Sequence, residues 1–197
     1  MNDSLFYNIS GVVLAGGKSS RMGKDKALIS FGDSDTLTQY QYEKLRGIFH
    51  KVYISTKEDK FDFINKESLI FDTSDISSPM VALRSILNSV EDQKVFIMAV
   101  DTPLVLSKTI SEIVDYALKT SFDIVVAKDT EGNRHNLCAV FDRSILPLID
   151  KCIDEDIHKL NYLIDKTNFK ELEFGVSDQF LNINTEKVYT KAVSLIN

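Results

Sequence analysis

The residues from Gly11 to Leu28 constrain the fold of this chain more than any other stretch. They read G-V-V-L-A-G-G-K-S-S-R-M-G-K-D-K-A-L, so an apolar run leads directly into a glycine pair and a loop with four cations. An apolar run without polar alternation favours a parallel strand buried on both faces. Glycines lack a Cβ, so backbone N–H groups there can approach an anion closely, and cationic side chains can neutralise phosphate oxygens. The combination predicts a nucleoside triphosphate site after a buried strand.

Composition limits the partners of such a site. The chain has 197 residues, 44% hydrophobic and 26% charged, which is ordinary for one globular domain with a sizeable core. Its formal net charge of −6 disfavours wholesale binding to nucleic acid. A local cationic loop in an acidic chain therefore indicates a site for a small anion.

The cysteines and the apolar stretches indicate the compartment. Cys138 and Cys152 lack metal-site spacing and are too few for a disulfide framework, which is typical of a reducing cytosol. We expect one buried and one half-buried small apolar residue. No apolar stretch approaches transmembrane length, and the start M-N-D-S-L-F-Y-N does not resemble a signal peptide. We expect a cytoplasmic protein with no membrane contact.

Strand-like apolar runs alternate with helical patterns along nearly the whole chain. This alternation predicts an α/β fold: a single Rossmann-like domain, residues 1–197, with a mostly parallel sheet flanked by helices on both faces. The predicted strands are Ile9–Leu14, Val52–Thr56, Leu69–Phe71, Val95–Val100, Asp123–Ala127, Leu137–Phe141, Lys170–Phe174 and Phe180–Ile183. The predicted helices are Thr36–Phe49, Ser78–Val90, Ser107–Lys119, Arg143–Cys152 and Thr185–Ile196.

Two of these helices begin with capping signals. Ser78 is the predicted N-cap of one, with Pro79 at the first helical position. Ser107 is the predicted N-cap of the next. Apolar stripes on both helices indicate faces that pack in the core.

The glycine loop matches neither of two familiar phosphate-binding fingerprints. The pattern G-x-x-x-x-G-K-[ST] fails because Gly17 and Gly23 are wrongly spaced and Lys24 is followed by Asp25. The pattern G-x-G-x-x-G fails because Gly16 and Gly17 are adjacent. These failures disfavour a helicase or a GTPase switch.

Residues 14–28, L-A-G-G-K-S-S-R-M-G-K-D-K-A-L, resemble the signature of nucleotidyltransferases that join a nucleoside monophosphate to molybdopterin, above all the molybdenum cofactor guanylyltransferases. Three further segments match that family in order: Asp72 ahead of S-P-M at 78–80, A-V-D-T-P-L at 99–104, and N-I-N-T-E at 182–186, where the family's proline is missing. The resemblance implies the nucleotide-diphospho-sugar transferase-like fold. We expect a nucleotide-binding half at residues 9–105 and an acceptor-binding half at residues 106–197.

Residue types in the loop suggest how it contacts a triphosphate. Arg21 suits bidentate phosphate contact, and Lys26 suits a point charge on the β- and γ-phosphate oxygens. The resemblance implies that Lys26 is the stronger triphosphate ligand and that backbone groups of the strand end hold the nucleotide. The predicted nucleotide contacts here are Leu14, Ala15, Gly16, Gly17, Arg21 and Lys26.

Three positions bear on the choice of base. The resemblance implies that Asp72 lies beside the base, where a carboxylate can accept the N1–H and N2–H₂ hydrogen bonds of guanine; a turn aspartate is the alternative. Ser55 falls where the family has an asparagine near the base. Gly16 favours GTP, since the related cytidylyltransferases tend to have alanine there.

Asp101 follows the most apolar run of the chain, Val95–Val100. A carboxylate at the carboxyl end of a central parallel strand lies where open α/β sheets bind ligands. An oxygen ligand there suits Mg²⁺, which uses few protein carboxylates plus substrate phosphates; the alternative is an aspartate of the turn before Pro103. The family uses this aspartate for its metal, so the resemblance implies that Asp101 is the Mg²⁺ ligand.

Asn182 and Asn184 alternate with apolar residues, which predicts that they share one face of a strand. The resemblance implies that this face meets the reaction centre; a solvated edge is the alternative. H-N-L at 135–137 resembles the family's His-Pro-x, with Asn136 in place of proline. His135 is a candidate for binding the pterin or an ordinary structural histidine.

The resemblance implies Mg²⁺-dependent transfer of GMP from GTP to the terminal phosphate of molybdopterin, with pyrophosphate released. A phosphate nucleophile is anionic near neutral pH, which explains a sequence without a nucleophile–base pattern. Transient contact with cofactor-insertion or chaperone proteins is also implied. The predicted catalytic residues, acting by positioning and charge neutralisation, are Arg21, Lys26, Asp101, Asn182 and Asn184.

Alternatives remain on the same scaffold. One is a cytidylyltransferase, and another is a nucleotidyltransferase for a different phosphate acceptor, such as a sugar phosphate or phospholactate. A third is a non-catalytic nucleotide-binding protein, which the presence of both Lys26 and Asp101 disfavours.

Overall fold

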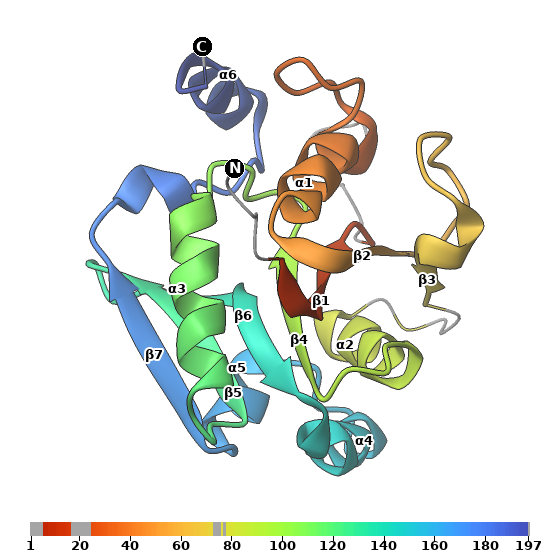
Figure 1. Ribbon diagram of the computed structural model, residues 1–197, viewed down its shortest axis with the longest axis vertical. Coiled ribbons are helices and arrows are strands. Elements are labelled where there is room, and N and C mark those ends of the chain that lie inside the picture. The colour runs from red at the N-terminus through yellow and green to blue at the C-terminus, as the bar shows by residue number, and fades with distance from the viewer. Residues whose placement is uncertain (1–5, 17–24, 73–75, 77, 197) are drawn as a thin grey trace.

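The computed structural model describes residues 6–16, 25–72, 76 and 78–196. Within these residues, seven strands form one sheet in the order β3-β2-β1-β4-β6-β5-β7 (Figure 1). Neighbouring strands are parallel except where β6 pairs with β4 and β5, so the prediction of a mostly parallel sheet is confirmed. The strands are β1 (Tyr7–Leu14), β2 (Phe49–Thr56), β3 (Leu69–Phe71), β4 (Lys94–Ala99), β5 (Ile124–Asp129), β6 (Arg134–Asp142) and β7 (Phe169–Phe174).

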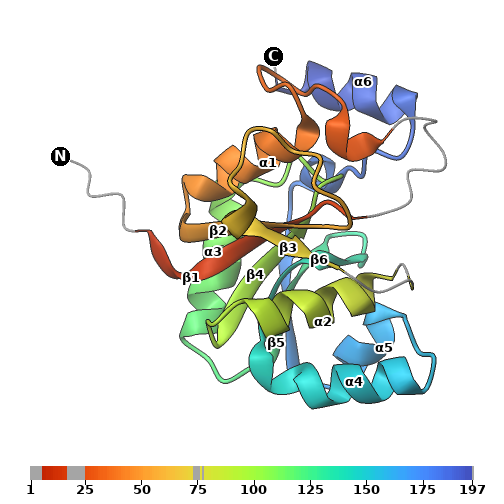
Figure 2. The same ribbon diagram turned by 90° about the vertical axis from the view of Figure 1, so that its right-hand side faces the viewer.

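Helices cover both faces of the sheet, as predicted (Figure 2). Val13 of β1 packs in the apolar cluster with α1 and α3, whereas Val12 and Leu14 pack in the cluster with α2, α4 and α5. Burial on both faces explains why β1 shows no polar alternation. The helices are α1 (Leu37–Arg46), α2 (Pro79–Ser89), α3 (Ser107–Leu118), α4 (Leu146–Asp154), α5 (Leu160–Asp165) and α6 (Glu186–Ser194). Short 3₁₀ helices are η1 (Lys26–Leu28), η2 (Lys66–Ser68), η3 (Arg143–Ile145) and η4 (Ser177–Phe180).

Gly11 lets β1 pass close to an aromatic pair in the core. A Cβ at this position would lie 2.6 Å from Phe49 Cδ2. The Phe49 ring stacks on Phe96 with ring centroids 5.4 Å apart. A side chain at position 11 would therefore displace the packing beneath α1.

One predicted helix cap is confirmed and the other is wrong. The Ser78 hydroxyl accepts a hydrogen bond from Val81 N–H, and Pro79 begins α2. The N-cap of α3 is Leu106 rather than Ser107. The first turn of α3 is tied to a distant segment instead: the buried Gln179 Oε1 accepts hydrogen bonds from Leu106 N–H and from the Thr109 hydroxyl.

Several predicted boundaries also differ from the structure. The strand predicted at Phe180–Ile183 is wrong, because residues 177–180 form η4 and residues 181–184 have no regular secondary structure. The helix predicted at Thr36–Phe49 ends at Arg46, since Phe49 already begins β2. The short helix α5 was not predicted.

The described residues contain no helix long and apolar enough to cross a membrane. Both cysteines are buried, so Cys152 is more enclosed than expected. Burial raises the pKa of the Cys138 thiol to about 12, which keeps it neutral.

Candidate active site

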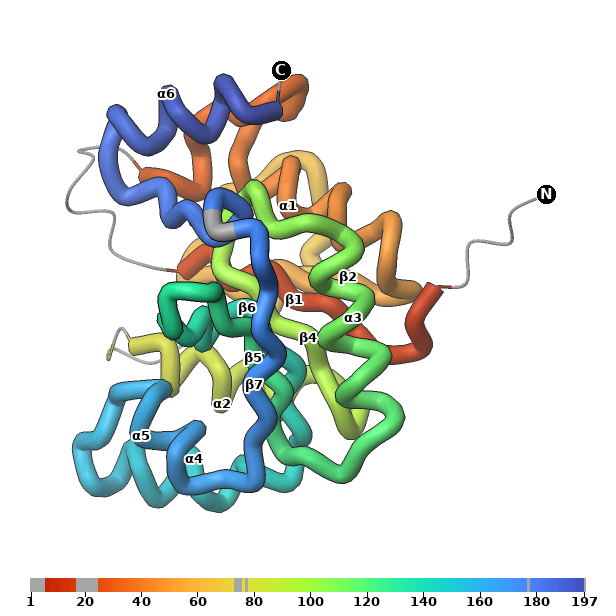
Figure 3. Tube along the Cα trace, turned by 90° about the vertical axis from the view of Figure 1, so that its left-hand side faces the viewer, coloured from red at the N-terminus to blue at the C-terminus, as the bar shows by residue number. Residues whose placement is uncertain are grey.

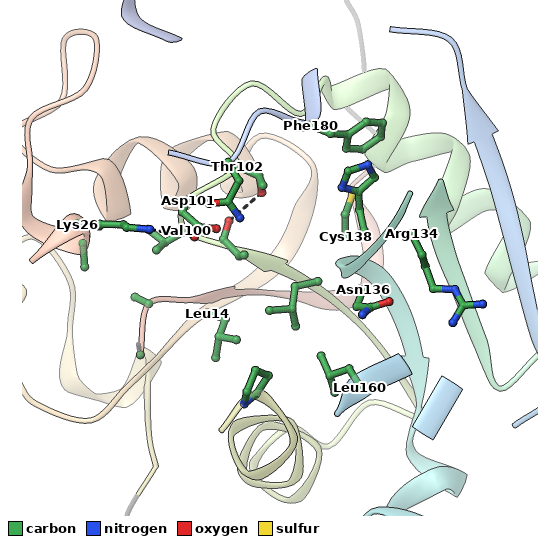
Figure 4. Close-up of a pocket in the computed structure, with 18 of the residues that line it drawn as sticks. Leu14, Lys26, Val100, Asp101, Thr102, Arg134, Asn136, Cys138, Leu160 and Phe180 are labelled. Atoms are coloured by element: carbon green, nitrogen blue, oxygen red, sulfur yellow. Dashed lines mark hydrogen bonds and ion pairs between the residues drawn. The ribbon is translucent and has the colours of Figure 1, made fainter. Parts of the chain in front are cut away.

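A cavity of about 590 Å³ opens at the carboxyl ends of β1 and β4 (Figure 4). Open α/β sheets bind ligands at this edge. Because β6 is antiparallel to β4, its first residues reach the same edge and form the opposite wall. One end of the cavity is lined by Leu14, Ala15, Gly16, Lys26, Asp101 and Asn182.

Segments far apart in the sequence meet at Lys26. Its ammonium lies 3.5 Å from Asp101 Oδ2 and donates a hydrogen bond to Asn184 Oδ1. The Lys26 side chain is 13% exposed and that of Asp101 is 22% exposed, so both charges are largely shielded from bulk water. Figure 4 shows the Lys26 side chain pointing toward Asp101. Shielding strengthens the interaction of both groups with a charged ligand.

The environment of Asp101 combines burial with hydrogen bonding. Burial raises the pKa of Asp101, and this effect outweighs the lowering by the Lys26 charge and by hydrogen bonds from Lys26 and Asn182. A carboxylate that is incompletely compensated by the protein gains more from an added cation. The site therefore suits a ligand that carries positive charge to Asp101.

Local structure holds Lys26 in place. Asp25 caps η1, because its Oδ1 accepts a hydrogen bond of 3.0 Å from Ala27 N–H. Lys60 forms an ion pair with Asp25 on its other oxygen. The Thr38 hydroxyl of α1 donates to Ala27 O at 2.8 Å. The η1 turn is thus fixed to both neighbouring segments.

The segment 181–184 reaches the site without forming a strand. Ile183 N–H donates to Asp101 O at 2.8 Å. Beyond it, Thr185 caps α6, and the Tyr189 hydroxyl donates to Ser30 O at 2.8 Å. Figure 3 shows α6 beside the segment that follows η1. Docking of α6 therefore brings the C-terminal segment back to Lys26.

Ser55 and Asp72 lie at the carboxyl ends of β2 and β3, beside this cavity rather than in its lining. Asp72 N–H donates to Thr56 O at 2.9 Å, and Asp72 is buried. The Ser55 hydroxyl is buried with no hydrogen-bond partner among the described groups. A buried hydroxyl is normally paired, so Ser55 has capacity for an added polar group. Gly17 and Arg21 lie outside the described residues.

The far end of the cavity is polar and aromatic, and most of it was missed from the sequence. His135 stacks on Phe180 with ring centroids 4.0 Å apart and planes 9° apart. His135 Nε2 lies 3.1 Å from Asp129 Oδ2. Burial alone would raise the pKa of Asp129, but hydrogen bonds from Asn133 and His135 lower it to about 2. This end is lined by Arg134, His135, Asn136, His158, Lys159 and Phe180.

An irregularity in β6 directs its residues into the cavity. Val126 of β5 pairs with Ala139, yet the next residue, Ala127, pairs with His135. Residues 136–138 therefore have no partners on β5 and bulge toward the cavity. Strand prediction from Leu137 onward could not reveal this shift.

The comparisons with known proteins agree with this architecture. Residues 11–170 match the family of the MobA-like NTP transferase domain. Molybdenum cofactor guanylyltransferase from Campylobacter jejuni is 37% identical over 182 residues, 91% of this chain and 93% of that protein. The protein of the same name from Helicobacter pylori strain G27 is 31% identical over 201 residues, 100% of this chain and 97% of that protein.

A solved structure has the same fold. The crystal structure of molybdopterin-guanine dinucleotide biosynthesis protein A from Archaeoglobus fulgidus superposes with a TM-score of 0.80, at 17% identity over 95% of this chain and 98% of that chain. That likeness concerns the fold alone. The family match and the full-length relatives go further: this chain is a nucleotidyltransferase of the MobA-like NTP transferase family and belongs to the molybdenum cofactor guanylyltransferases.

Proposed function

We propose that this protein transfers GMP from GTP to the terminal phosphate of molybdopterin and releases pyrophosphate. The observation that carries the proposal is the Lys26–Asp101 pair at the ligand-binding edge of the sheet, in a chain whose relatives are molybdenum cofactor guanylyltransferases. The reaction takes place in the cytoplasm, with transient contact to proteins that insert or protect the cofactor.

The triphosphate lies along the end of β1, in the half formed by residues 9–105. Backbone groups of Leu14, Ala15 and Gly16, which line the cavity, face the nucleotide. The Lys26 ammonium and the Arg21 guanidinium neutralise the β- and γ-phosphates, and Gly17 gives the loop its close approach. The base lies toward the ends of β2 and β3, where Asp72 accepts the guanine N–H groups and the unpaired Ser55 hydroxyl gains a partner.

The described residues fit a Mg²⁺ ion that arrives with the triphosphate. Asp101 supplies a buried carboxylate, and Asn182 supplies a carboxamide beside it. Mg²⁺ is commonly held by one or two carboxylates plus substrate phosphates and water. No group of three or more His, Cys, Asp and Glu side chains in the described ranges forms a metal site by itself, which agrees with this arrangement. When bound, the ion neutralises charge on the phosphates.

The reaction forms one P–O bond and breaks another. An oxygen of the acceptor's terminal phosphate attacks the α-phosphorus of GTP, and the oxygen that bridges to the β-phosphate leaves with its electron pair as pyrophosphate. The attacking phosphate is already anionic, so no general base is required. Lys26 and Arg21 neutralise the departing charge, while Asn184 orients Lys26 and Asn182 orients Asp101.

The acceptor occupies the far end of the cavity, in the half formed by residues 106–197. The stacked His135–Phe180 pair offers a flat wall to a bicyclic ring, and Asn136 offers a carboxamide to its polar edge. Lys159 adds a cation at the same end. A planar, polar and anionic acceptor fits this lining.

Titration calorimetry with GTP, CTP, ATP and UTP, each with Mg²⁺, tests the nucleotide half of the proposal. Tighter binding of GTP by about tenfold or more supports transfer of GMP, since an unmatched hydrogen bond at the base costs about 1–3 kcal/mol and about 1.4 kcal/mol corresponds to tenfold in affinity. Preference for CTP supports a cytidylyltransferase. GTP binding without turnover on molybdopterin supports either a different phosphate acceptor, tested with sugar phosphates and phospholactate, or a non-catalytic nucleotide-binding protein.

A further inference from the structure

Two side chains of helix α1 hold the backbone on either side of Asp101, in addition to the bonds from Val100 N–H to Leu14 O and from Ile183 N–H to Asp101 O. β4 ends at Ala99, and residues 100–106 continue without strand pairing. Gln41 Nε2 donates to Ala99 O at 3.2 Å and to Val100 O at 3.5 Å. Lys44 Nζ donates to Pro103 O and, at 3.1 Å, to Val105 O. These bonds flank Asp101 on both sides in the sequence.

Gln41 and Lys44 share one face of α1, because residues three apart are neighbours on a helix. Gln41 is fully buried. The Lys44 ammonium also lies 4.9 Å from the centre of the Tyr40 ring. Both side chains therefore project inward from α1 under the Asp101 segment, where an ordinary amphipathic helix would place apolar residues.

The two inward polar side chains of α1 cost stability, so stability does not explain why they are there. Burial lowers the pKa of Lys44 to about 8, so the ammonium is costly to keep charged there. The described contacts of Lys44 are carbonyls and an aromatic ring, and the nearby Cys138 thiol stays neutral. Gln41 Oε1 is buried without a hydrogen-bond partner among the described groups. A leucine at position 44 would avoid the first penalty, and a leucine at position 41 would avoid the second.

We propose that Gln41 and Lys44 are positioning residues, which fix the backbone from Ala99 to Val105 so that Asp101 keeps its place opposite Lys26. The inference rests on the proposed function, because it gives Asp101 its role toward the metal and the phosphates. Neither residue touches substrate; each acts through two backbone carbonyls, Gln41 through those of Ala99 and Val100 and Lys44 through those of Pro103 and Val105. A displacement of about 1 Å at a reacting centre can lower turnover by about 100-fold.

The test compares Lys44→Met and Gln41→Met with Arg46→Met. The first two variants keep side-chain volume and remove the donors, whereas Arg46 lies on the same helix with its side chain 60% exposed. We expect faster hydrogen exchange at the amides of Val100, Thr102 and Val105 in both inward variants, by about tenfold or more. We also expect kcat to fall about tenfold and the half-saturating Mg²⁺ concentration to rise, with metal-free GTP affinity within about twofold.

The exposed control and the two inward variants together decide whether Gln41 and Lys44 position Asp101. Arg46→Met should leave exchange, kcat and Mg²⁺ dependence unchanged. If the inward variants exchange faster yet keep kcat and Mg²⁺ dependence, their role is only structural and the proposal is overturned. The same holds if turnover falls without faster exchange at residues 100–105. If Lys44→Met does not fold, Gln41→Met decides alone. A wild-type protein without transferase activity would contradict the proposed function, whereas exchange would still report whether α1 fixes this segment.

Discussion

Lys26 Nζ donates a hydrogen bond to Asn184 Oδ1, although 158 residues separate the two in the sequence. Asn184 precedes the cap of α6, and α6 is tied to the η1 segment through Tyr189 and Ser30. The orientation of the main cation of the site therefore depends on the C-terminal helix. A change at Asn184 should therefore affect the rate of transfer more than the affinity for the nucleotide.

Asn184→Ala should slow transfer and spare GTP binding. Without its partner, Lys26 keeps its charge but samples other rotamers, so kcat should fall about tenfold while the dissociation constant of GTP changes about twofold or less. Steady-state kinetics and calorimetry measure the two quantities. Thr190→Ala, on the exposed part of α6, is the control. Complete loss of GTP binding would place Asn184 in the nucleotide pocket itself.

Lys26→Met should discriminate between nucleotides by their phosphates. The ammonium is expected on the β- and γ-phosphates, so affinity for GTP should fall about 100-fold, as for loss of a strong charge-assisted contact. Affinity for GMP should fall about threefold or less. Lys66→Met, at a side chain 81% exposed, should change neither. Equal losses for GTP and GMP would move Lys26 away from the terminal phosphates.

Asp101→Asn should keep the fold and lose Mg²⁺-dependent turnover. A neutral carboxamide is a poor ligand for a hard cation, and we expect a loss of about 100-fold or more in kcat. Because burial raises the pKa of Asp101, its ionised form is disfavoured, and the variant should melt no lower than wild type. Turnover at limiting Mg²⁺ and thermal unfolding check both parts. Unchanged turnover would remove Asp101 from the metal site.

The pH dependence of the free energy of unfolding should reveal the lowered pKa of Lys44. Its pKa is about 8 in the folded protein against 10.5 ordinarily, so between these values the unfolded chain binds more protons. The free energy of unfolding of wild type, relative to Lys44→Met, should therefore rise from pH 7.5 to pH 10.5, by at most roughly 3 kcal/mol. Urea unfolding across this range measures the difference. A flat difference would show that Lys44 keeps an ordinary pKa.

The sequence predicted the elements whose signals are local. Strand β1 was predictable because burial on both faces removes the polar alternation from its sequence. The start of α2 at Ser78 and Pro79 was predictable because the cap depends only on neighbouring residues. The positions of Leu14, Lys26 and Asp101 at one edge follow from the parallel strands before them. For these, local pattern and tertiary fold agree.

What the sequence did not predict depends on distant partners. Alternation at Asn182–Asn184 suggested a strand, yet this segment is held by the bond from Ile183 N–H to Asp101 O, by side-chain bonds to Asp101 and Lys26, and by the docking of α6. The start of α3 at Leu106 is tied to Gln179, a contact with a distant segment that the local sequence around Ser107 does not reveal. The far end of the cavity is shaped by the register shift of β6 and by helix α5. The register shift depends on a distant strand, and α5 is too short to be identified by its periodicity.

A transfer assay tests the central claim most directly. The purified protein is incubated with Mg²⁺, molybdopterin and GTP labelled at the α-phosphorus, and in parallel with GTP labelled at the γ-phosphorus. We predict that the α-label enters a molybdopterin dinucleotide and the γ-label appears in pyrophosphate, in equal amounts and with CTP as a poor substitute. Release of inorganic phosphate from the γ-position, or an α-label that stays in free nucleotides while GTP is bound, would contradict the account.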